Sequence, residues 1–323
     1  MRSMSTSFGQ AEILRTRALI DPVFLDSPAF SHGALDAALG CACVLKIETL
    51  NPIRSFKGRG AEAVMASIDP LPAHVIATSS GNWGQGLTRA ARRRGVGVTI
   101  FSQEGDNPGK LDAMRRLGAE VRLMPRGNDG KEEARRTADT MGARFVEDGG
   151  HPEIAMGAGT MAEELTRQSS DLDAIIVPIG DGALITGVGS WFKSASPRTR
   201  VVGVTAAGSP AMRLSLEAHR PITAPADTIA DGIAIHTPVA SAVDDVASVV
   251  DEIVSVNDES LLDAMALLLR TAGVVTEPSA AAGIAAILTH RALFESTRVA
   301  TIITGSNVRP DLLSEAAHRA ARV

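Results

Sequence analysis

The sequence predicts an α/β protein built on parallel, doubly wound sheets. Short runs of β-branched residues recur along the chain, and each is followed by a turn rich in glycine, serine or asparagine and then by an amphipathic helical pattern. Such alternation is typical of parallel strands joined by helical crossovers. Several runs are apolar on both faces, as strands buried between two layers of helices require.

Seven strands follow from these runs. In chain order they are Cys43–Glu48, Val75–Thr78, Val96–Phe101, Glu120–Met124, Ala174–Ile179, Arg200–Thr205 and Val299–Ile303. Four helices have recognisable ends: Gly84–Arg94, Pro108–Leu117, Lys131–Met141 and Glu259–Ala272. We expect Asn107 to cap the second of these helices, and Asp258 and Gly273 to bound the fourth.

The stretch from residue 74 to 150 contains three strand–helix alternations, enough for a small doubly wound unit. The sequence therefore predicts two α/β domains. Residues 1–73 and 151–323 form the large domain, and residues 74–150 form a small domain inserted into it.

Composition narrows the class of protein. The chain has 323 residues, 45% of them hydrophobic, and a net charge of -5, which excludes disorder and argues against a nucleic-acid or anionic-membrane partner. No apolar run follows Arg2, so we expect no secretory signal and a cytoplasmic protein. We also expect no appended regulatory domain, because only a short stretch follows Thr304. The only cysteines, Cys41 and Cys43, are interpreted as inert buried thiols, with a redox pair as the alternative.

Two of four notable segments supply an amine and an anion receptor. In residues 51–59, Phe56 directly precedes Lys57 in a turn that leads to a helix, so the amine can lie against a flat ring. In residues 78–85, hydroxyls, backbone N–H groups and a helix N-terminus converge, which suits a carboxylate. A solvated lysine and a capped turn are the plain alternatives.

The other two segments also follow strands, where open α/β sheets place ligands. Residues 177–187 form a glycine-rich strand-to-helix turn of the kind that holds a phosphate with main-chain donors. Ile185 breaks the dinucleotide pattern G-x-G-x-x-G, and no P-loop pattern occurs. In residues 303–307, Thr304 places a hydroxyl at the end of the last strand.

In this order the four segments resemble the fold-type II pyridoxal phosphate enzymes, which include serine/threonine dehydratases, serine racemase, threonine synthase and cysteine synthase. The resemblance extends from about Cys43 to Asn307 and includes Gly157–Thr160, Thr228–Gly232 and Glu277–Ala280. The nearest branch is that of the dehydratases and the racemase, whose S-F-K-x-R and S-S-G-N turns are present here. The resemblance implies the tryptophan synthase β-like fold, pyridoxal 5'-phosphate as cofactor, an amino acid substrate and a homodimer.

The resemblance also implies residue roles. Lys57 matches the lysine that holds the cofactor as a Schiff base and then takes the α-proton, which requires a depressed pKa. Ser80 matches the second proton base of the racemase, although a serine that caps a helix needs no catalytic role. The cofactor residues are Phe56, Lys57, Asn82, Gly180, Asp181, Gly182, Ala183, Leu184 and Thr304, and the substrate residues are Ser79, Ser80, Gly81, Asn82 and Trp83.

Thr304 matches the hydroxyl residue that faces the pyridine nitrogen. A hydroxyl is not a counterion for a pyridinium, so the ring nitrogen is expected to stay neutral, which favours elimination over transamination. The implied reaction is removal of the α-proton by Lys57, loss of a β-hydroxyl with proton help from the cofactor phosphate, and hydrolysis of an aminoacrylate to a 2-oxo acid and ammonia.

The sequence departs from the family at three places. Trp83 stands where the dehydratases have His, and its indole is either a wall of the substrate pocket or a packing residue. Asp181 and Ala183 interrupt the usual glycine run, and we expect the Asp181 side chain to turn away from the phosphate and cap the next helix. Thr205 replaces the Glu of racemase-like metal sites, so no divalent metal site is predicted, while binding of a monovalent cation through carbonyl oxygens stays open.

The leading hypothesis is an ammonia-lyase acting on a β-hydroxy-α-amino acid of the serine/threonine type, or on a bulkier aryl-serine. An amino-acid racemase and a β-replacement synthase are the alternatives. A non-catalytic amino-acid sensor is disfavoured because a sensor needs no Lys57. Glu277 is either an inward charge near the cofactor or a simple carboxylate at a helix start.

Overall fold

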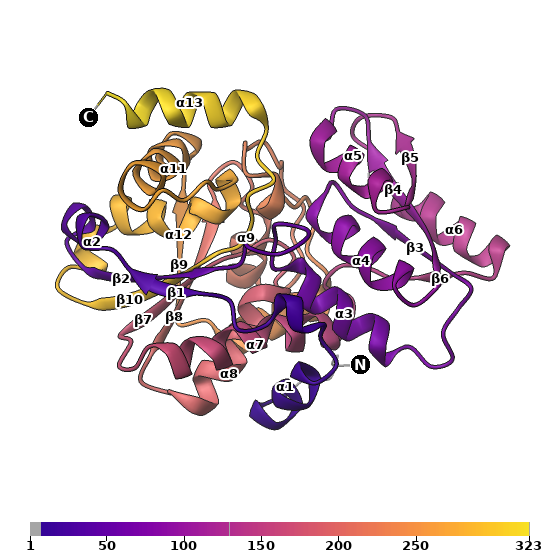
Figure 1. The fold of residues 1–323 in the computed structure, drawn as a ribbon, viewed down its shortest axis with the longest axis horizontal. Coiled ribbons are helices and arrows are strands. Elements are labelled where there is room, and N and C mark those ends of the chain that lie inside the picture. Colours follow the sequence, from indigo (N-terminus) through magenta and orange to yellow (C-terminus); the bar gives the residue numbers. More distant parts are fainter. Residues whose placement is uncertain (1–7, 129, 323) are drawn as a thin grey trace.

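The computed structural model describes residues 8–128 and 130–322, and it contains two twisted sheets that are flanked by helices (Figure 1). The larger sheet has six strands in the order β1-β2-β10-β7-β8-β9, all parallel except β1, which pairs antiparallel with β2. Its strands are β1 (Ala29–Ser31), β2 (Ala42–Ile47), β7 (Ala174–Pro178), β8 (Arg200–Ala206), β9 (Glu252–Val256) and β10 (Arg298–Ile303).

The smaller sheet is wholly parallel and has the order β5-β4-β3-β6. Its strands are β3 (His74–Thr78), β4 (Gly97–Gln103), β5 (Glu120–Met124) and β6 (Arg144–Phe145). Figure 1 shows this sheet on the right, with the six-stranded sheet on the left.

Thirteen α-helices and three short 3₁₀ helices are found in the described part of the chain. The α-helices are α1 (Gln10–Arg17), α2 (Gly33–Leu39), α3 (Lys57–Ser67), α4 (Asn82–Arg92), α5 (Pro108–Arg116), α6 (Lys131–Met141), α7 (Pro152–Gln168), α8 (Ala183–Ala195), α9 (Ala211–Ala218), α10 (Ala240–Val249), α11 (Asp258–Ala272), α12 (Pro278–Thr289) and α13 (Pro310–Ala320). The 3₁₀ helices are η1 (Pro22–Phe24), η2 (Asp231–Ile233) and η3 (Arg291–Leu293). None of the helices in the described residues is both long and apolar enough to cross a membrane.

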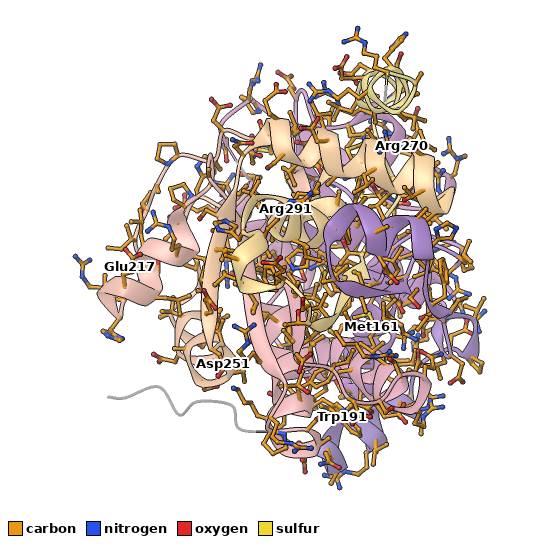
Figure 2. All side chains as sticks on the ribbon, turned by 90° about the vertical axis from the view of Figure 1, so that its left-hand side faces the viewer. Met161, Trp191, Glu217, Asp251, Arg270 and Arg291 are labelled. Carbon is orange, nitrogen blue, oxygen red and sulfur yellow. The ribbon has the colours of Figure 1, made fainter. Side chains whose placement is uncertain are left out.

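Helices cover both faces of the six-stranded sheet, because its strands alternate apolar side chains between two cores. Ile175 and Val177 pack with α7 and α8, whereas Ala174 and Ile176 pack with α11 and α12. In Figure 2, Met161 of α7 and Trp191 of α8 lie on the first side of this sheet, and Arg270 at the end of α11 lies on the other. The doubly wound α/β class predicted from the sequence is confirmed.

The predicted elements agree with the structure within a few residues. Strand β5 and helix α6 have the predicted bounds, and Asn107 caps α5 by accepting a hydrogen bond from the Gly109 N–H. The predicted cap of α11 is wrong: Asn257 accepts from the Ser260 N–H, while Asp258 accepts from the Thr228 hydroxyl and the Ile229 N–H. The strands missed from sequence, β1, β6 and β9, are all edge strands, which are short or less apolar.

The two cysteines are buried and unpaired. Burial raises the pKa of the Cys41 thiol to about 11 and that of Cys43 well above its usual value. Both thiols are therefore protonated at neutral pH, which favours the interpretation as inert thiols.

The sheet order brings distant segments to one edge. Strand β10 lies between β2 and β7 and runs parallel to both, so the turns that follow these three strands emerge side by side. These turns lead to Lys57, to Asp181 and to Thr304. The topology thus gathers three of the four segments singled out in the sequence.

Candidate active site

Lys57 is the first residue of α3, and its amine lies among groups from several parts of the chain. Its Nζ is 2.6 Å from Asp148 Oδ2, in the segment before α7, and 2.8 Å from Asp181 Oδ2, in the loop between β7 and α8. The centroid of the Phe56 ring is 5.2 Å from Nζ. The amine therefore sits against a ring, as the Phe56–Lys57 order suggested, and between two carboxylates.

The turn that carries Lys57 is fastened to the segment that carries Thr304. The Phe56 N–H donates to the Thr304 carbonyl oxygen over 3.0 Å, and Ser55 forms an isolated antiparallel bridge with Gly305. The Thr304 side chain is buried and hydrogen-bonds to none of the described residues. Its hydroxyl is thus available to a ligand.

Asp181 does cap the next helix, because its Oδ1 accepts a hydrogen bond from the Ala183 N–H over 2.8 Å. The expectation that the side chain turns away is wrong, however, because its other oxygen contacts the Lys57 amine. The attraction between opposite charges in a part-buried site explains this orientation. A phosphate bound by this loop would lie near the Asp181 carboxylate, whereas the family usually has a glycine at this position.

The two carboxylates control the charge of the amine. Burial alone would lower the pKa of Lys57, but Asp148 and Asp181 outweigh it and raise the pKa above its ordinary value. The expected depression of the Lys57 pKa concerns the amine beside bound cofactor, and it stays a prediction. Burial, assisted by the charge of Asp181, raises the pKa of Asp148 to about 7, whereas Lys57 and the Ala183 N–H hold the pKa of Asp181 below its usual value.

The loop from Gly180 to Leu184 has the shape of an anion receptor. A Cβ on Gly180 would lie 2.9 Å from the Gly232 carbonyl oxygen, and Gly182 has φ +100°, so both positions favour glycine. Ala183 and Leu184 begin α8, where the first N–H groups have no partner within the helix. The Ala183 N–H is occupied by Asp181 Oδ1, so the Leu184 N–H and the positive end of the helix dipole are the groups that suit a phosphate.

The turn before α4 was predicted to receive a carboxylate. Ser79 Oγ accepts hydrogen bonds from the Gly81 N–H at 3.0 Å and the Gly84 N–H at 2.9 Å, so Ser79 closes this helix start. Ser80 is exposed and its hydroxyl makes no hydrogen bond to the described residues. Capping therefore does not account for Ser80.

Asn82 is held by two neighbours from the large sheet's side of the site. Its amide donates to Glu277 Oε1 over 2.6 Å, and its carbonyl oxygen accepts from the Asn307 amide over 2.8 Å. A Cβ on Gly305 would lie 2.3 Å from Glu277 Oε1, so only glycine leaves room for this arrangement. Glu277 is therefore an inward, buried carboxylate.

Trp83 is buried, with 3% of its surface exposed, in the core that also contains Leu87 and Met114. Its indole N–H has no hydrogen-bond partner among the described residues. Burial suits the packing interpretation and the free N–H suits the pocket interpretation, so both remain.

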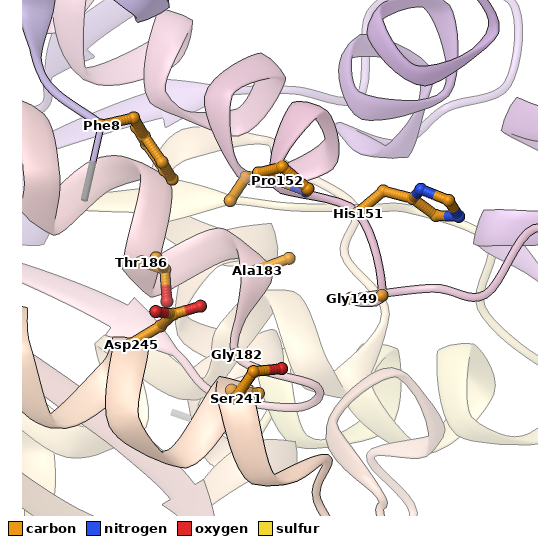
Figure 3. A pocket seen from close by; sticks show the side chains of 12 residues that line it. Phe8, Gly149, His151, Pro152, Gly182, Ala183, Thr186, Ser241 and Asp245 are labelled. Carbon is orange, nitrogen blue, oxygen red and sulfur yellow. The ribbon is translucent and has the colours of Figure 1, made fainter. Parts of the chain in front are cut away.

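A pocket adjoins the glycine loop (Figure 3). It lies at the starts of α7 and α8 and is lined by Gly149, Pro152, Gly182 and Ala183, while Asp245 and neighbouring residues of α10 close another side. Lys57 does not line it. The pocket is therefore beside the amine and not around it.

The residues gathered here fit pyridoxal phosphate. A lysine amine, main-chain donors at the start of α8 and the free Thr304 hydroxyl match the aldehyde, the phosphate and the ring nitrogen of the cofactor. The buried oxygen Oδ1 of Asp148 also lacks a partner in the described residues. Asp181 lies in the loop itself, so its charge opposes the phosphate.

Comparison with known proteins agrees with this fit. Residues 20–305 match the family model described as pyridoxal-phosphate dependent enzyme. The chain belongs to this family. It is therefore a pyridoxal phosphate-dependent enzyme of fold type II.

Three similar proteins represent the branch. The chain is 34% identical to the L-threonine ammonia-lyase of Thermotoga maritima over 303 residues, which cover 92% of this chain and 75% of that protein. The T.th. threonine deaminase superposes with a TM-score of 0.86 at 31% identity, covering 93% of this chain and 98% of that one. Maize serine racemase gives a TM-score of 0.88 at 28% identity, covering 97% and 98%.

Sequence reasoning missed two groups of site residues. Asp148 follows the two-residue strand β6, which was not recognised; an acidic residue before Gly149 and Gly150 was the available signal. Lys110 lies inside α5, and Asp231 lies in a segment noted only as a secondary signature. Only the fold brings these last two together, with Nζ of Lys110 2.8 Å from Asp231 Oδ2.

Proposed function

We propose that this chain is an ammonia-lyase that converts a β-hydroxy-α-amino acid to a 2-oxo acid and ammonia by α,β-elimination. The observation that supports it best is the position of the Lys57 amine, which lies next to the glycine loop and whose turn is bonded to the Thr304 segment. Similarity to a threonine ammonia-lyase and a threonine deaminase favours a substrate of the serine/threonine type.

Bound pyridoxal phosphate supplies an electron sink for the charge left when the α-proton departs. Lys57 Nζ is the proposed acceptor of that proton, and it acts only when uncharged. Asp148 Oδ2, 2.6 Å away, is the proposed acceptor of the amine's proton once burial beside the bound cofactor lowers the pKa of the amine. The Asp148 pKa of about 7 suits a group that gives and takes a proton at neutral pH.

The proposed substrate site is the start of α4. The Ser80 N–H and the positive end of the helix dipole attract the substrate carboxylate, because the N–H groups of Ser79 and Gly81 already donate to the Phe101 carbonyl oxygen and to Ser79 Oγ. Asn82 is the proposed donor to the cofactor's phenolate oxygen, and Trp83 a proposed wall for the substrate side chain. We further propose that residues 74–150 form a small domain that closes over the substrate.

A racemase is the second candidate. Ser80 is exposed and unbonded to the described residues, so its hydroxyl is free to exchange a proton with the face opposite Lys57. Similarity to maize serine racemase also favours it. We propose a cytoplasmic homodimer in either case.

The test is to incubate the cofactor-loaded protein with serine, threonine and an aryl-serine, and to assay 2-oxo acid and D-enantiomer separately. We expect 2-oxo acid as the main product. Borohydride should attach the cofactor to Lys57, and Lys57→Ala should lose both this adduct and turnover. Formation of D-enantiomer without 2-oxo acid would establish the racemase instead.

A further inference from the structure

Lys110 is a second buried lysine near the proposed active site. Lys110 belongs to α5, beside the four-stranded sheet, and only 3% of its side chain is exposed. Its Nζ lies 2.9 and 2.8 Å from the two carboxylate oxygens of Asp231 and 3.1 Å from Glu277 Oε2. Asp231 and Glu277 belong to elements packed on the six-stranded sheet, so this ion cluster joins the two halves of the molecule.

The cluster is connected to Asn82 through one carboxylate. Glu277 uses Oε2 for Lys110 and Oε1 for the Asn82 amide, at 2.6 Å. Asn82 in turn receives a hydrogen bond from Asn307, whose carbonyl oxygen accepts from Asn107 at the start of α5. A closed circuit of polar contacts therefore runs from α5 through Asn82 and back to α5.

The cluster also touches the carboxylate-binding turn. A Cβ on Gly81 would lie 2.2 Å from Lys110 Cδ, so the lysine stem passes directly against this turn and only a glycine admits it. The stem is thus confined between the turn and the two carboxylates. Lys110 is in a position to fix both the turn and Asn82.

Charge explains why a lysine is required at this position. Burial raises the pKa of Glu277 and the charge of Asp231 adds to this effect, while Lys110 and the Asn82 amide oppose it. Burial would lower the pKa of Lys110, but Glu277 and Asp231 together raise it. Without the ammonium, a buried carboxylate beside another acid takes up a proton, and its charge-assisted bond to Asn82 is weakened.

We propose that Lys110 is a positioning residue: by pairing with Asp231 and Glu277 from the other half of the molecule, it holds the Glu277 carboxylate on the Asn82 amide and so fixes the side chain that is proposed to face the cofactor. This inference rests on the proposed role of Asn82. It does not require the lyase reaction itself, because cofactor binding and cofactor spectrum report on Asn82 directly.

The experiment compares Lys110→Met, which keeps length and loses charge, with Lys110→Arg, which keeps the charge. The pH titration of the absorbance of the bound cofactor is recorded without substrate, and kcat and KM are then measured with threonine. Lys110→Met should shift the midpoint of this absorbance titration to higher pH by at least one unit, because Glu277 without the ammonium holds its proton more tightly. It should also lower kcat at least tenfold, with a smaller change in KM. Lys110→Arg should keep the titration midpoint and kcat close to the wild-type values.

Matched variants make the outcome decisive. Lys193→Met removes a lysine that pairs with Asp251 at the surface, and it should change neither spectrum nor kinetics. Glu277→Gln should abolish the pH titration of the cofactor absorbance, because it removes the carboxyl group whose charge Lys110 controls. Adding Lys110→Met to Glu277→Gln should lower kcat only slightly further. If Lys110→Met fails to fold, Lys110→Arg and Glu277→Gln still test the titration.

A purely structural role predicts a different result. In that case Lys110→Met lowers the melting temperature but leaves the spectral midpoint and kcat of the folded protein unchanged, and this would overturn the proposal. Failure of the proposed function is separate: a wild-type protein that binds cofactor but forms no 2-oxo acid still gives the spectral titration.

Discussion

Lys57 and Arg59 lie on the same turn of α3, and each belongs to a cluster of charged side chains. The two clusters differ in how completely their charges are paired. Lys57 is paired with Asp148 and Asp181 beside the glycine loop, where the three side chains keep 11%, 22% and 28% of their surfaces exposed. Arg59, two residues later, is fully buried with Glu48 and Glu164. Because successive helix positions point to different sides, one short segment serves both clusters.

Every charge in the Arg59 cluster has a close partner. Arg59 donates two hydrogen bonds to each of the carboxylates of Glu48 and Glu164, at 2.7 to 2.9 Å, and one to the Thr160 hydroxyl. Lys46, also fully buried, donates to Glu164 over 2.7 Å. Arg59 and Lys46 outweigh burial and lower the pKa of Glu164 to about 2.

The Lys57 cluster is left out of balance. One ammonium faces two carboxylates, Asp148 Oδ1 has no partner among the described residues, and the pKa of Asp148 is raised where that of Glu164 is lowered. A satisfied cluster holds the fold, whereas an unsatisfied one leaves groups that can bind a ligand or move a proton. By this contrast, the Arg59 cluster suits a structural role and the Lys57 cluster suits a functional one.

The largest expected effect of this contrast is on stability. Arg59→Met leaves Glu48 and part of Glu164 buried without their main partner, and should lower the free energy of unfolding by about 3–5 kcal/mol. Lys57→Met is the matched control, and should lower it by about 1 kcal/mol or less because its carboxylates are partly solvated. Urea unfolding of both cofactor-free variants measures the difference. Equal losses would mean that the two clusters are both structural.

The second expected effect is a pH dependence of opposite sign. The pKa of Glu164 is about 2 in the folded protein and 4.5 ordinarily, so its stabilisation is present above pH 4.5 and is lost as the pH falls toward 2. The pKa of Asp148 is raised from 3.8 to about 7, so its contribution is full below pH 3.8 and is lost as the pH rises through 7.

Asp148→Asn should therefore remove the decline in the free energy of unfolding between pH 4 and 7 and leave the decline at acid pH. Each shifted pKa unit corresponds to about 1.4 kcal/mol, so the two proteins should differ visibly in slope. Urea unfolding of the cofactor-free proteins across pH 3–8 is the measurement. Parallel curves would show that Asp148 has no raised pKa.

The third expected effect concerns the cofactor. Asp181→Gly removes a carboxylate from the loop proposed to hold the phosphate, and the dissociation constant of pyridoxal phosphate should fall about tenfold, equivalent to about 1.4 kcal/mol. Asp181→Asn, which retains an oxygen for the Ala183 N–H, should give most of the same gain. Absorbance titration measures both, and weaker binding in both variants would mean that Asp181 helps to hold the cofactor.

The sequence could predict the segments of the site but not all of their contacts. Strand-end turns such as those at Lys57 and Thr304 were found because parallel sheets place ligands at strand ends, and β10 does lie between β2 and β7. Asp148 was missed because it follows a two-residue edge strand with no apolar pattern. The orientation of Asp181 was not predicted because Lys57 is 124 positions away in the sequence. Only the fold brings the two side chains into contact.

The smallest expected effect concerns Trp83, which is buried next to Asn82 and whose indole N–H has no partner in the described residues. If its ring forms a wall of the substrate pocket, a bulkier apolar β-substituent gains about 25 cal/mol per Å² of area buried there. The gain is graded, since one methylene is worth only about 1–3 kcal/mol of discrimination. The ratio of kcat/KM for an aryl-serine to that for serine should therefore exceed one in the wild type and fall several-fold in Trp83→His. Serine as the best substrate, with a ranking that survives the substitution, would instead make Trp83 a packing residue of the core that contains Leu87 and Met114.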